Sequence, residues 1–252
     1  MLKLHGNALD ANIVVGSHQL FTVTRSSALD DSEKRWHAYL LDGMNVDSGY
    51  GCYLDFGGIH KTSSHTEGYL NLPMEMGYLA EGDIISVEPS GHVNVVFRVN
   101  SPHNTILLTE RCNHYCLMCS QPPKDVDDSW LMGEAMELLD LIPKETGNIG
   151  FSGGEPTLYG AQFIELISKA KKSHPKTAID VLSNGRRFSD LEFTQSYAAI
   201  NHPDCLLGIP IYSDDPVRHD YIVQSSGAFD ETIRGILNLK KYNQKVEIRI
   251  VI

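Results

Sequence analysis

The sequence has no long apolar run: none of its stretches approaches the roughly 18 residues that a membrane-spanning helix needs. Residues 1–10 lack the basic start and apolar core of a secretory signal. Repeats at solenoid periods and low-complexity tracts are also missing from the 252 residues. We therefore expect a cytoplasmic protein with no membrane partner, built as one large domain or two modest ones.

Positive charge is scarce. The chain has 21 Lys and Arg residues against 32 Asp and Glu residues, a formal net charge of −11. A surface that binds nucleic acid needs a basic face, so we expect no nucleic acid partner. An acidic chain is likewise a poor match for an anionic membrane. The hydrophobic fraction of 42% and the charged fraction of 21% are typical of a folded globular protein and argue against a disordered chain.

Cysteine is also scarce, and its distribution is uneven. There are five cysteines, an odd number that disfavours an extracellular disulfide framework. Three of them fall within eight residues in a Cys-x3-Cys-x2-Cys pattern: Cys112, Cys116 and Cys119. Cys52 and Cys205 stand alone. Such crowding in a cytosolic chain indicates metal or cluster ligation.

The three crowded cysteines allow two kinds of metal site. A structural zinc site needs a fourth Cys or His ligand, typically from a second paired motif, and the sequence has no second Cys-x2-Cys. An iron–sulfur cluster is usually held by four cysteines, and three leave one iron open to a non-protein ligand. We therefore favour an iron–sulfur cluster over zinc, and both over three buried free thiols.

The residue pattern differs between two parts of the chain. In residues 1–100, apolar and aromatic residues recur at strand spacing, and residues 83–99 predict a β-hairpin. Residues 101–104 form a linker, because the proline at its second position disfavours regular pairing. We predict a small β-rich domain over 1–100 and a second domain over 101–252.

From Thr105 onward, strand and helix patterns alternate. Apolar runs predict strands over 105–109, 148–152, 178–182, 205–212 and 246–252. Helical spacing predicts helices over 130–142, 161–172, 191–200 and 229–241. Alternation of this kind is typical of βα units that form a parallel sheet, so we expect an α/β fold.

The segments that follow the first three of these strands resemble the radical S-adenosylmethionine (radical SAM) enzymes. The Cys-x3-Cys-x2-Cys loop is the hallmark of that family, Gly153-Gly154-Glu155-Pro156 looks like its Gly-Gly-Glu-Pro segment, and Ser183-Asn184-Gly185 is similar to its third SAM-contact segment. The resemblance implies a partial radical SAM (βα) barrel. It also implies two cofactors, SAM and a [4Fe–4S] cluster held by Cys112, Cys116 and Cys119.

The same resemblance implies which residues contact SAM. The set carried over to this sequence is Met118, Gly153, Gly154, Glu155, Ser183, Asn184 and Ser213. The glycines allow a close approach of backbone to ligand, and the Glu155 carboxylate matches the SAM ammonium. Met118 stands where many relatives have an aromatic residue near the adenine, and Ser213 substitutes for a hydroxyl that Pro210 replaces.

The sequence does not assign a single residue to the SAM carboxylate, nor a catalytic residue. No arginine follows His219-Asp220 where many relatives have one, so we expect the SAM carboxylate to meet Arg186, Arg187 or Arg249. No catalytic residue is assigned. Parallel βα barrels place their chemistry at the carboxyl ends of the strands, and the first cysteine, Cys112, falls near one such end.

A finer resemblance lies in residues 109–124, TERCNHYCLMCSQPPK, and in Glu81-Gly82-Asp83 before them. These resemble the radical SAM maturases of the His-Xaa-Ser system. The resemblance implies reductive cleavage of SAM to a 5′-deoxyadenosyl radical, which takes a hydrogen atom from a ribosomally made peptide with His-Xaa-Ser repeats. Its implied partners are that precursor peptide, a reductant protein such as flavodoxin or ferredoxin, and a second radical SAM maturase.

Other functions stay open. The barrel could act on a small molecule or activate a glycyl-radical enzyme, or the chain could be a catalytically inactive, cluster-bearing partner of another maturase. Residues 1–100 could hold a leader or repeat peptide at an exposed sheet edge, or could only cover the barrel.

The predicted barrel ends early. Radical SAM domains resemble a partial barrel of about six βα units, the open relative of the eight-unit barrel. This sequence predicts five strands from Thr105 and stops at Ile252 inside an apolar strand. An edge strand shows unpaired backbone. We therefore expect either a fragment truncated after the fifth strand or a partner chain that covers this edge, with cover by the N-terminal domain as the alternative.

Overall fold

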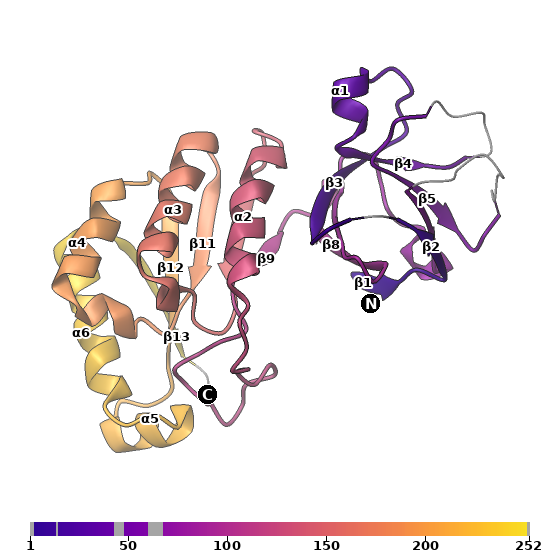
Figure 1. Cartoon of the computed structure of the whole chain (residues 1–252). Helices are drawn as coiled ribbons and strands as arrows, with labels where there is room; N and C mark the ends of the chain where they lie inside the picture. Colours follow the sequence, from indigo (N-terminus) through magenta and orange to yellow (C-terminus); the bar gives the residue numbers. More distant parts are fainter. Residues whose placement is uncertain (1–2, 14, 43–47, 60–67, 251–252) are drawn as a thin grey trace. The chain divides into compact units, whose positions relative to one another are not determined.

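The computed structural model describes residues 3–13, 15–42, 48–59 and 68–250, and it divides the chain into two compact units (Figure 1). Unit 1 is Met1–Asn104 and unit 2 is Thr105–Ile252. The division falls at the end of the segment that the sequence predicts as a linker. A search of the described residues finds no helix with the length and apolar character needed to cross a membrane.

Unit 1 is built on one mixed eight-stranded sheet in the order β1-β8-β7-β3-β4-β5-β6-β2. Its strands are β1 (His5–Asn7), β2 (Asp10–Asn12), β3 (Gln19–Thr24), β4 (His37–Leu40), β5 (Cys52–Phe56), β6 (Tyr69–Leu72), β7 (Ile84–Val87) and β8 (His92–Phe97). A short helix, α1 (Asp31–Lys34), and a 3-10 turn, η1 (Met74–Met76), complete the described elements.

The hairpin predicted over residues 83–99 is confirmed as the antiparallel pair β7 and β8. Strict alternation explains it, because Val93, Val95 and Phe97 of β8 are buried while the residues between them are partly exposed. The opposite side of the sheet carries tyrosines. Tyr39 and Tyr53 are paired across β4 and β5, and Tyr53 is paired with Tyr69 of β6.

Unit 2 is a five-stranded parallel sheet in the order β13-β12-β11-β10-β9, with helices over one face (Figure 1). The strands are β9 (Thr105–Leu107), β10 (Asn148–Ser152), β11 (Ala178–Leu182), β12 (Cys205–Ile211) and β13 (Lys245–Ile250). The helices are α2 (Ser129–Leu141), α3 (Ala161–Ser173), α4 (Leu191–Ile200), α5 (Pro216–Val223) and α6 (Ala228–Lys241), with 3-10 turns η2 (Pro156–Tyr159) and η3 (Arg186–Ser189). The predicted α/β partial barrel is confirmed.

The core of unit 2 follows from alternation along its strands. Ile149 and Phe151 of β10 and Ile179 of β11 are fully buried, and each side chain of this kind stabilises the fold by about 1.5–3 kcal/mol. The other parity includes polar residues: the Asn148 amide donates to Asp180 at 2.7 Å. The parallel strands therefore bring their carboxyl ends, with the predicted site residues, to one edge of the sheet.

One helix was missed by the sequence analysis. Residues 215–224 were interpreted only as part of the SAM site, whereas Pro216–Val223 forms α5. The sequence carries a helix-start signal here, an aspartate followed by a proline. In the structure Asp215 accepts a hydrogen bond from the Val217 backbone N–H at 2.9 Å, and Pro216 occupies the first helical position.

Candidate functional site

The residues from Cys112 to Cys119, called here the cysteine loop, follow β9 at the carboxyl edge of the sheet. All three thiols are free; Cys112 and Cys116 are half-buried and Cys119 is exposed. The His114 backbone N–H donates to the Cys112 Sγ at 3.4 Å, and the Cys119 thiol donates to the Gln121 carbonyl at 2.9 Å. The loop therefore presents three thiols to one region of the molecule.

Electrostatic effects show that the three thiols are neighbours. The pKa of Cys112 is raised to about 11, mainly by burial and in smaller part by the charges of Glu155, Cys116 and Cys119. Burial also raises the pKa of Tyr212, which follows β12, and the charge of each of the three cysteines adds to that rise. The ends of β9, β10 and β12 therefore meet around the cysteine loop. A bound iron would remove the thiol protons outright.

The donor set fits an iron–sulfur cluster. Within the part of the chain that the structure describes, no three His, Cys, Asp or Glu side chains lie at the spacing of ligands to one metal ion. A [4Fe–4S] cluster differs from a single ion because each cysteine binds a different iron of a larger body. Three free, neighbouring thiols on one loop, with a backbone N–H directed at one sulfur, match that requirement.

The Gly-Gly-Glu segment lies directly against the residues that precede the cysteine loop. The Gly154 N–H donates to the Thr109 carbonyl at 2.7 Å, and the Glu155 N–H donates to the Arg111 carbonyl at 2.8 Å. A Cβ on Gly153 would collide with the Thr109 carbonyl, and one on Gly154 would collide with the Arg111 carbonyl. Glycine is therefore required here because two backbone segments pack together, in addition to any approach of a ligand.

The carboxylate of Glu155 joins the ends of β10 and β11. It is 1% exposed and accepts hydrogen bonds from the Thr157 N–H at 3.0 Å, the Thr157 hydroxyl at 2.5 Å, the Ser183 hydroxyl at 2.8 Å and the Asn184 N–H at 2.6 Å. Burial raises its pKa, and these hydrogen bonds oppose that rise. The structure therefore gives Glu155 a bridging role, and its direct contact with the SAM ammonium stays a prediction.

Two predicted SAM contacts lie outside this bridge. Met118 is 48% exposed on the cysteine loop. Ser213 is half-buried before α5, where its hydroxyl accepts from the Asp215 N–H at 3.1 Å. The hydrogen bonds of the described residues join Glu155 to Ser183 and Asn184, and they include neither Met118 nor Ser213 in that group.

The three arginines expected near the SAM carboxylate occupy different surroundings. Arg186 donates from Nε to Glu231 at 2.6 Å. Arg187 lies over the Phe193 ring of α4, 5.4 Å from its centroid, on the helical side. The guanidinium of Arg249 lies beside Gly208, whose Cβ would be 2.9 Å from the Arg249 Nε. On β13, the Arg249 Nε also donates to Glu247 at 2.6 Å.

The sequence analysis missed Asp128, which holds the segment between β9 and the cysteine loop from the other side. This 3% exposed carboxylate accepts from the Thr109 hydroxyl at 2.9 Å, the Glu110 N–H and the Tyr159 hydroxyl at 2.6 Å. Burial alone would raise the pKa of Asp128, but these hydrogen bonds outweigh it and the pKa is lowered. The available signal was the pair of aspartates before a serine and an apolar helix, which is typical of a helix start.

It also missed two buried histidines. His114 of the cysteine loop and His219 of α5 are 4% and 1% exposed, and the Nε2 atom of each lacks a hydrogen-bond partner among the described residues. Burial lowers the pKa of His114 to about 4 and lowers that of His219. Both imidazoles are therefore neutral near pH 7. Burial of these side chains could not be read from the sequence.

Comparisons with known proteins identify a family for the second unit. A family model described as the radical SAM superfamily matches residues 106–252. The molybdenum cofactor biosynthesis protein 1 of Drosophila melanogaster is 31% identical over 164 residues, 59% of this chain and 27% of that protein. The Fe-coproporphyrin III synthase of Methanosarcina barkeri (strain Fusaro / DSM 804) is 29% identical over 150 residues, 58% of this chain and 35% of that protein. The chain thus spans about a third of the length of these curated relatives.

Among solved structures, native anSMEcpe with bound AdoMet is similar at 21% sequence identity and a TM-score of 0.43. The match covers 57% of this chain and 42% of that chain. Methylornithine synthase is similar at 16% identity and a TM-score of 0.44, covering 59% of this chain and 44% of that chain.

Proposed function

The chain belongs to the radical SAM superfamily, and from that premise we propose that it is an enzyme that cleaves SAM reductively. The family uses a [4Fe–4S] cluster and SAM, which when bound supply a 5′-deoxyadenosyl radical that removes a hydrogen atom from the substrate. Cys112, Cys116 and Cys119 would hold the cluster. The observation that carries the proposal is that these three free thiols share one loop at the carboxyl edge of a parallel sheet.

The chain's own residues orient this loop. The Gly154 and Glu155 N–H groups bond to its start, and Asp128 holds the preceding strand end from the opposite side. Glu155 ties this region to the end of β11 through Ser183 and Asn184. These contacts fix the loop to the sheet, which is what a site needs in order to align its ligands and exclude water from a reactive species.

SAM cleavage tests the proposal. Chain loaded anaerobically with iron and sulfide is incubated with SAM and dithionite, and 5′-deoxyadenosine is measured by mass spectrometry. We expect its release from the wild type and from Cys205→Ala, which changes a buried cysteine of β12, and none from Cys119→Ala. A wild-type chain that carries about four irons and releases no 5′-deoxyadenosine would refute the proposed activity.

For the substrate, we propose a ribosomally made precursor peptide with His-Xaa-Ser repeats. The support is the run at residues 109–124, which resembles the maturases of that system. The curated relatives favour a second candidate, a small molecule, because their names describe molybdenum cofactor biosynthesis and the synthesis of a porphyrin. A reductant protein, for which dithionite substitutes in the test, and a second maturase are proposed partners.

The two substrate classes are separated by isotope transfer. A repeat-bearing peptide labelled with deuterium on carbon is added to the loaded chain, and 5′-deoxyadenosine is analysed for deuterium. We expect transfer from the peptide together with a mass change in the peptide. Deuterium-free 5′-deoxyadenosine and an unchanged peptide, under conditions where SAM is cleaved, would favour a small-molecule substrate or a glycyl-radical enzyme partner.

We propose that unit 1 helps to hold this peptide. Its eight-stranded sheet ends in β1 on one side and β2 on the other, and an edge strand can accept an extended peptide as an added strand. Peptide affinity of the full chain is compared with that of a chain that starts at Ser101. Equal affinity in a soluble shortened chain would contradict this role.

A further inference from the structure

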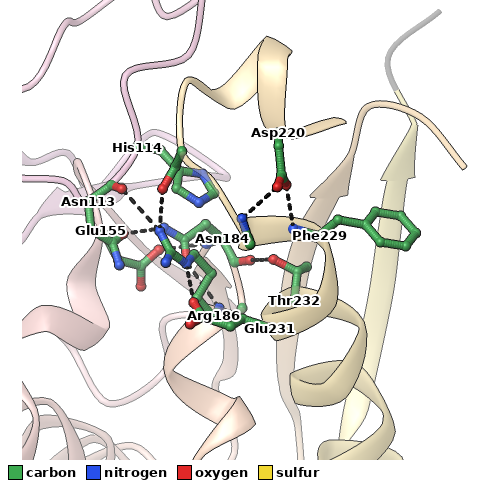
Figure 2. A network of polar contacts seen from close by, with 12 residues as sticks. Asn113, His114, Glu155, Asn184, Arg186, Asp220, Phe229, Glu231 and Thr232 are labelled. Carbon is green, nitrogen blue, oxygen red and sulfur yellow. Dashed lines mark hydrogen bonds and ion pairs between the residues drawn. The ribbon is translucent and has the colours of Figure 1, made fainter. Parts of the chain in front are cut away.

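Each polar group of Asn184 has a hydrogen-bond partner in this chain (Figure 2). Its backbone N–H donates to Glu155 at 2.6 Å, and its backbone carbonyl accepts from the Thr232 hydroxyl at 3.0 Å. Its side-chain amide donates to the Asn113 side chain at 2.7 Å and accepts from the Arg186 N–H at 3.0 Å. The Asn184 side chain is therefore held at both its amide nitrogen and its amide oxygen by other residues of this chain.

Arg186 connects the same point to α6. Its Nε donates to the Glu231 carboxylate at 2.6 Å, and its Nη1 donates to the Ser225 hydroxyl at 2.7 Å and to the Asn113 carbonyl at 3.2 Å. The Arg186 side chain is 15% exposed, so its ion pair with Glu231 is shielded from water on one side. Asn113, which directly follows Cys112, is therefore held by its side chain and by its carbonyl at once.

The second half of the cysteine loop is anchored to α5. The Tyr115 N–H donates to the Val223 carbonyl and the Leu117 N–H donates to the Ile222 carbonyl, both at 3.0 Å. The α5 helix is in turn tied to the start of α6, because Asp220 accepts from the N–H groups of Gly227 at 2.6 Å and Phe229 at 2.8 Å (Figure 2). The α5 helix thus contacts the second half of the loop directly, and α6 contacts Asn184 and Arg186, which hold the first half.

From these contacts, and resting on the function proposed above, we infer that Asn184 and Arg186 are positioning residues for the cysteine loop. They hold Asn113, and with it the loop, in the shape that the cluster requires before the cluster is bound. Glu231 acts one step further away by orienting Arg186. This assignment replaces a direct SAM contact for Asn184 with a structural one, and it removes Arg186 from the candidates for the SAM carboxylate.

Amide hydrogen exchange of the cluster-free chain tests the inference without relying on the proposed activity. We expect Arg186→Gln to speed exchange of the Tyr115 and Leu117 amides about tenfold, which corresponds to about 1.4 kcal/mol of local opening. Asn184→Ala should have the same effect. Arg187→Gln is the matched control, since this neighbour is 54% exposed and its contact with Asp190 is 3.9 Å long; it should change exchange less than about twofold.

If Arg186→Gln does not fold, two milder variants allow the same exchange measurement. Glu231→Gln retains an acceptor on a half-exposed side chain, and Arg186→Lys retains the charge. We expect Glu231→Gln to increase exchange at Leu117 by a smaller factor, and Arg186→Lys to restore part of the protection lost in Arg186→Gln. Wild-type exchange at Tyr115 and Leu117 in folded Arg186→Gln would overturn the inference.

Cluster measurements separate this role from ligand binding. After reconstitution, we expect Asn184→Ala to hold less iron while its affinity for SAM, per loaded cluster, stays within about twofold of the wild type. Full iron content with wild-type amide exchange and a selective loss of SAM affinity would instead make Asn184 a ligand contact and refute the positioning role. Failure of the wild type to bind iron would refute the proposed function but leave the exchange result intact.

Discussion

The two units of the chain differ in where their buried polar groups gather. In unit 1 they are spread over the sheet: Asp83 accepts from the N–H groups of Ala80 and Val99 at 3.0 and 2.9 Å, and Asp55 of β5 accepts from the Tyr69 hydroxyl of β6 at 2.8 Å. In unit 2 several of them lie together at the carboxyl edge of the sheet. Glu155 joins the ends of β10 and β11, and Asp128 joins the start of the cysteine loop to the turn after β10.

The difference indicates which part of the fold serves a functional site in addition to stability. Buried polar networks cost desolvation unless every member is satisfied, and an apolar core of similar volume would serve stability as well. Unit 2 nevertheless concentrates such groups at one edge of its sheet, next to three cysteines. The buried polar contacts of unit 1 join neighbouring strands and close turns, and the fold of that unit explains them. Substitutions in unit 2 should therefore affect both cluster content and stability, whereas substitutions in unit 1 should affect stability alone.

The largest contrast concerns cysteine. Replacing Cys112, Cys116 or Cys119 by Ala should abolish the cluster, because each removes one of three protein ligands. Cys52, fully buried in β5 of unit 1, should be replaceable by Ala with the cluster retained. Iron and sulfide analysis after anaerobic reconstitution measures both. Equal iron content in the five variants, Cys205→Ala included, would contradict the assignment of the loop.

Glycine substitutions in the two units should separate folding from cluster binding. Gly154→Ala places a methyl group against the Arg111 carbonyl and should destabilise unit 2 by about 3 kcal/mol while lowering cluster content. Gly51→Ala in unit 1 meets the Arg35 carbonyl and the Phe21 ring, and should destabilise unit 1 with the cluster retained.

Gly133→Ala is the control for both, because its Cβ would lie in open space on α2 and should stabilise that helix by about 0.5–1 kcal/mol. Urea unfolding and iron content are the two measurements. Cluster loss in Gly51→Ala as large as that in Gly154→Ala would show that the units are not independent in this respect.

Removal of a bridging carboxylate should have a smaller but local effect. Glu155→Ala leaves buried donors of Thr157, Ser183 and Asn184 without an acceptor, and we expect a loss of about 2–3 kcal/mol in the stability of unit 2. Asp83→Ala should destabilise unit 1 instead.

The two tryptophans report on the units separately, since Trp36 lies in unit 1 and Trp130 in unit 2. Urea unfolding is followed by fluorescence in Trp36→Phe and Trp130→Phe backgrounds. A Glu155→Ala chain whose transition shifts equally at both tryptophans would argue against a bridge that acts within unit 2.

The smallest expected contrast is in pH dependence. The buried histidines of the described residues, His114, His174 and His219, all lie in unit 2, and burial lowers the pKa of each below the usual 6.5. As pH falls, the unfolded chain is protonated first, so their contribution is complete above about pH 6.5 and is lost as pH falls below it, down to about pH 4 for His114. We expect the Trp130 transition to move to lower urea between pH 7 and pH 5.

His174 provides the variant for this test. It is fully buried in unit 2 and its Nε2 bonds to the Leu139 carbonyl at 2.8 Å. His174→Gln keeps a side-chain N–H donor and does not titrate, so it should weaken the pH dependence of the Trp130 transition. A variant with the same pH dependence as the wild type would show that this histidine does not contribute to it.

Much of unit 2 could be predicted from its sequence. The bounds of β10, β11 and α4 agree with the prediction, because apolar residues recur there with the period of the observed element. The cysteine spacing led to the family that the comparisons support. The parallel pairing of β3 with β4 in unit 1 could not be predicted, because alternation within a strand does not name its neighbour.

The contacts around the cysteine loop could not be predicted from the sequence for a different reason. Asn113, Arg186 and Glu231 are common polar residues in three separate segments, and only the packing of α6 brings them together. The motif predicts that Asn184 contacts SAM, and the structure adds that its side chain bonds to Asn113 of the cysteine loop. Motifs therefore located the site, and the tertiary structure was needed to show which residues contact the loop.

The central claim is that three cysteines of unit 2 hold a cluster with one iron open to SAM. Electron paramagnetic resonance of the reduced, reconstituted chain measures this directly, because a ligand on the open iron changes the g values of the cluster. We predict that saturating SAM alters the spectrum of the wild type and of Cys205→Ala alike. An unchanged spectrum in a chain that carries about four irons would contradict the account.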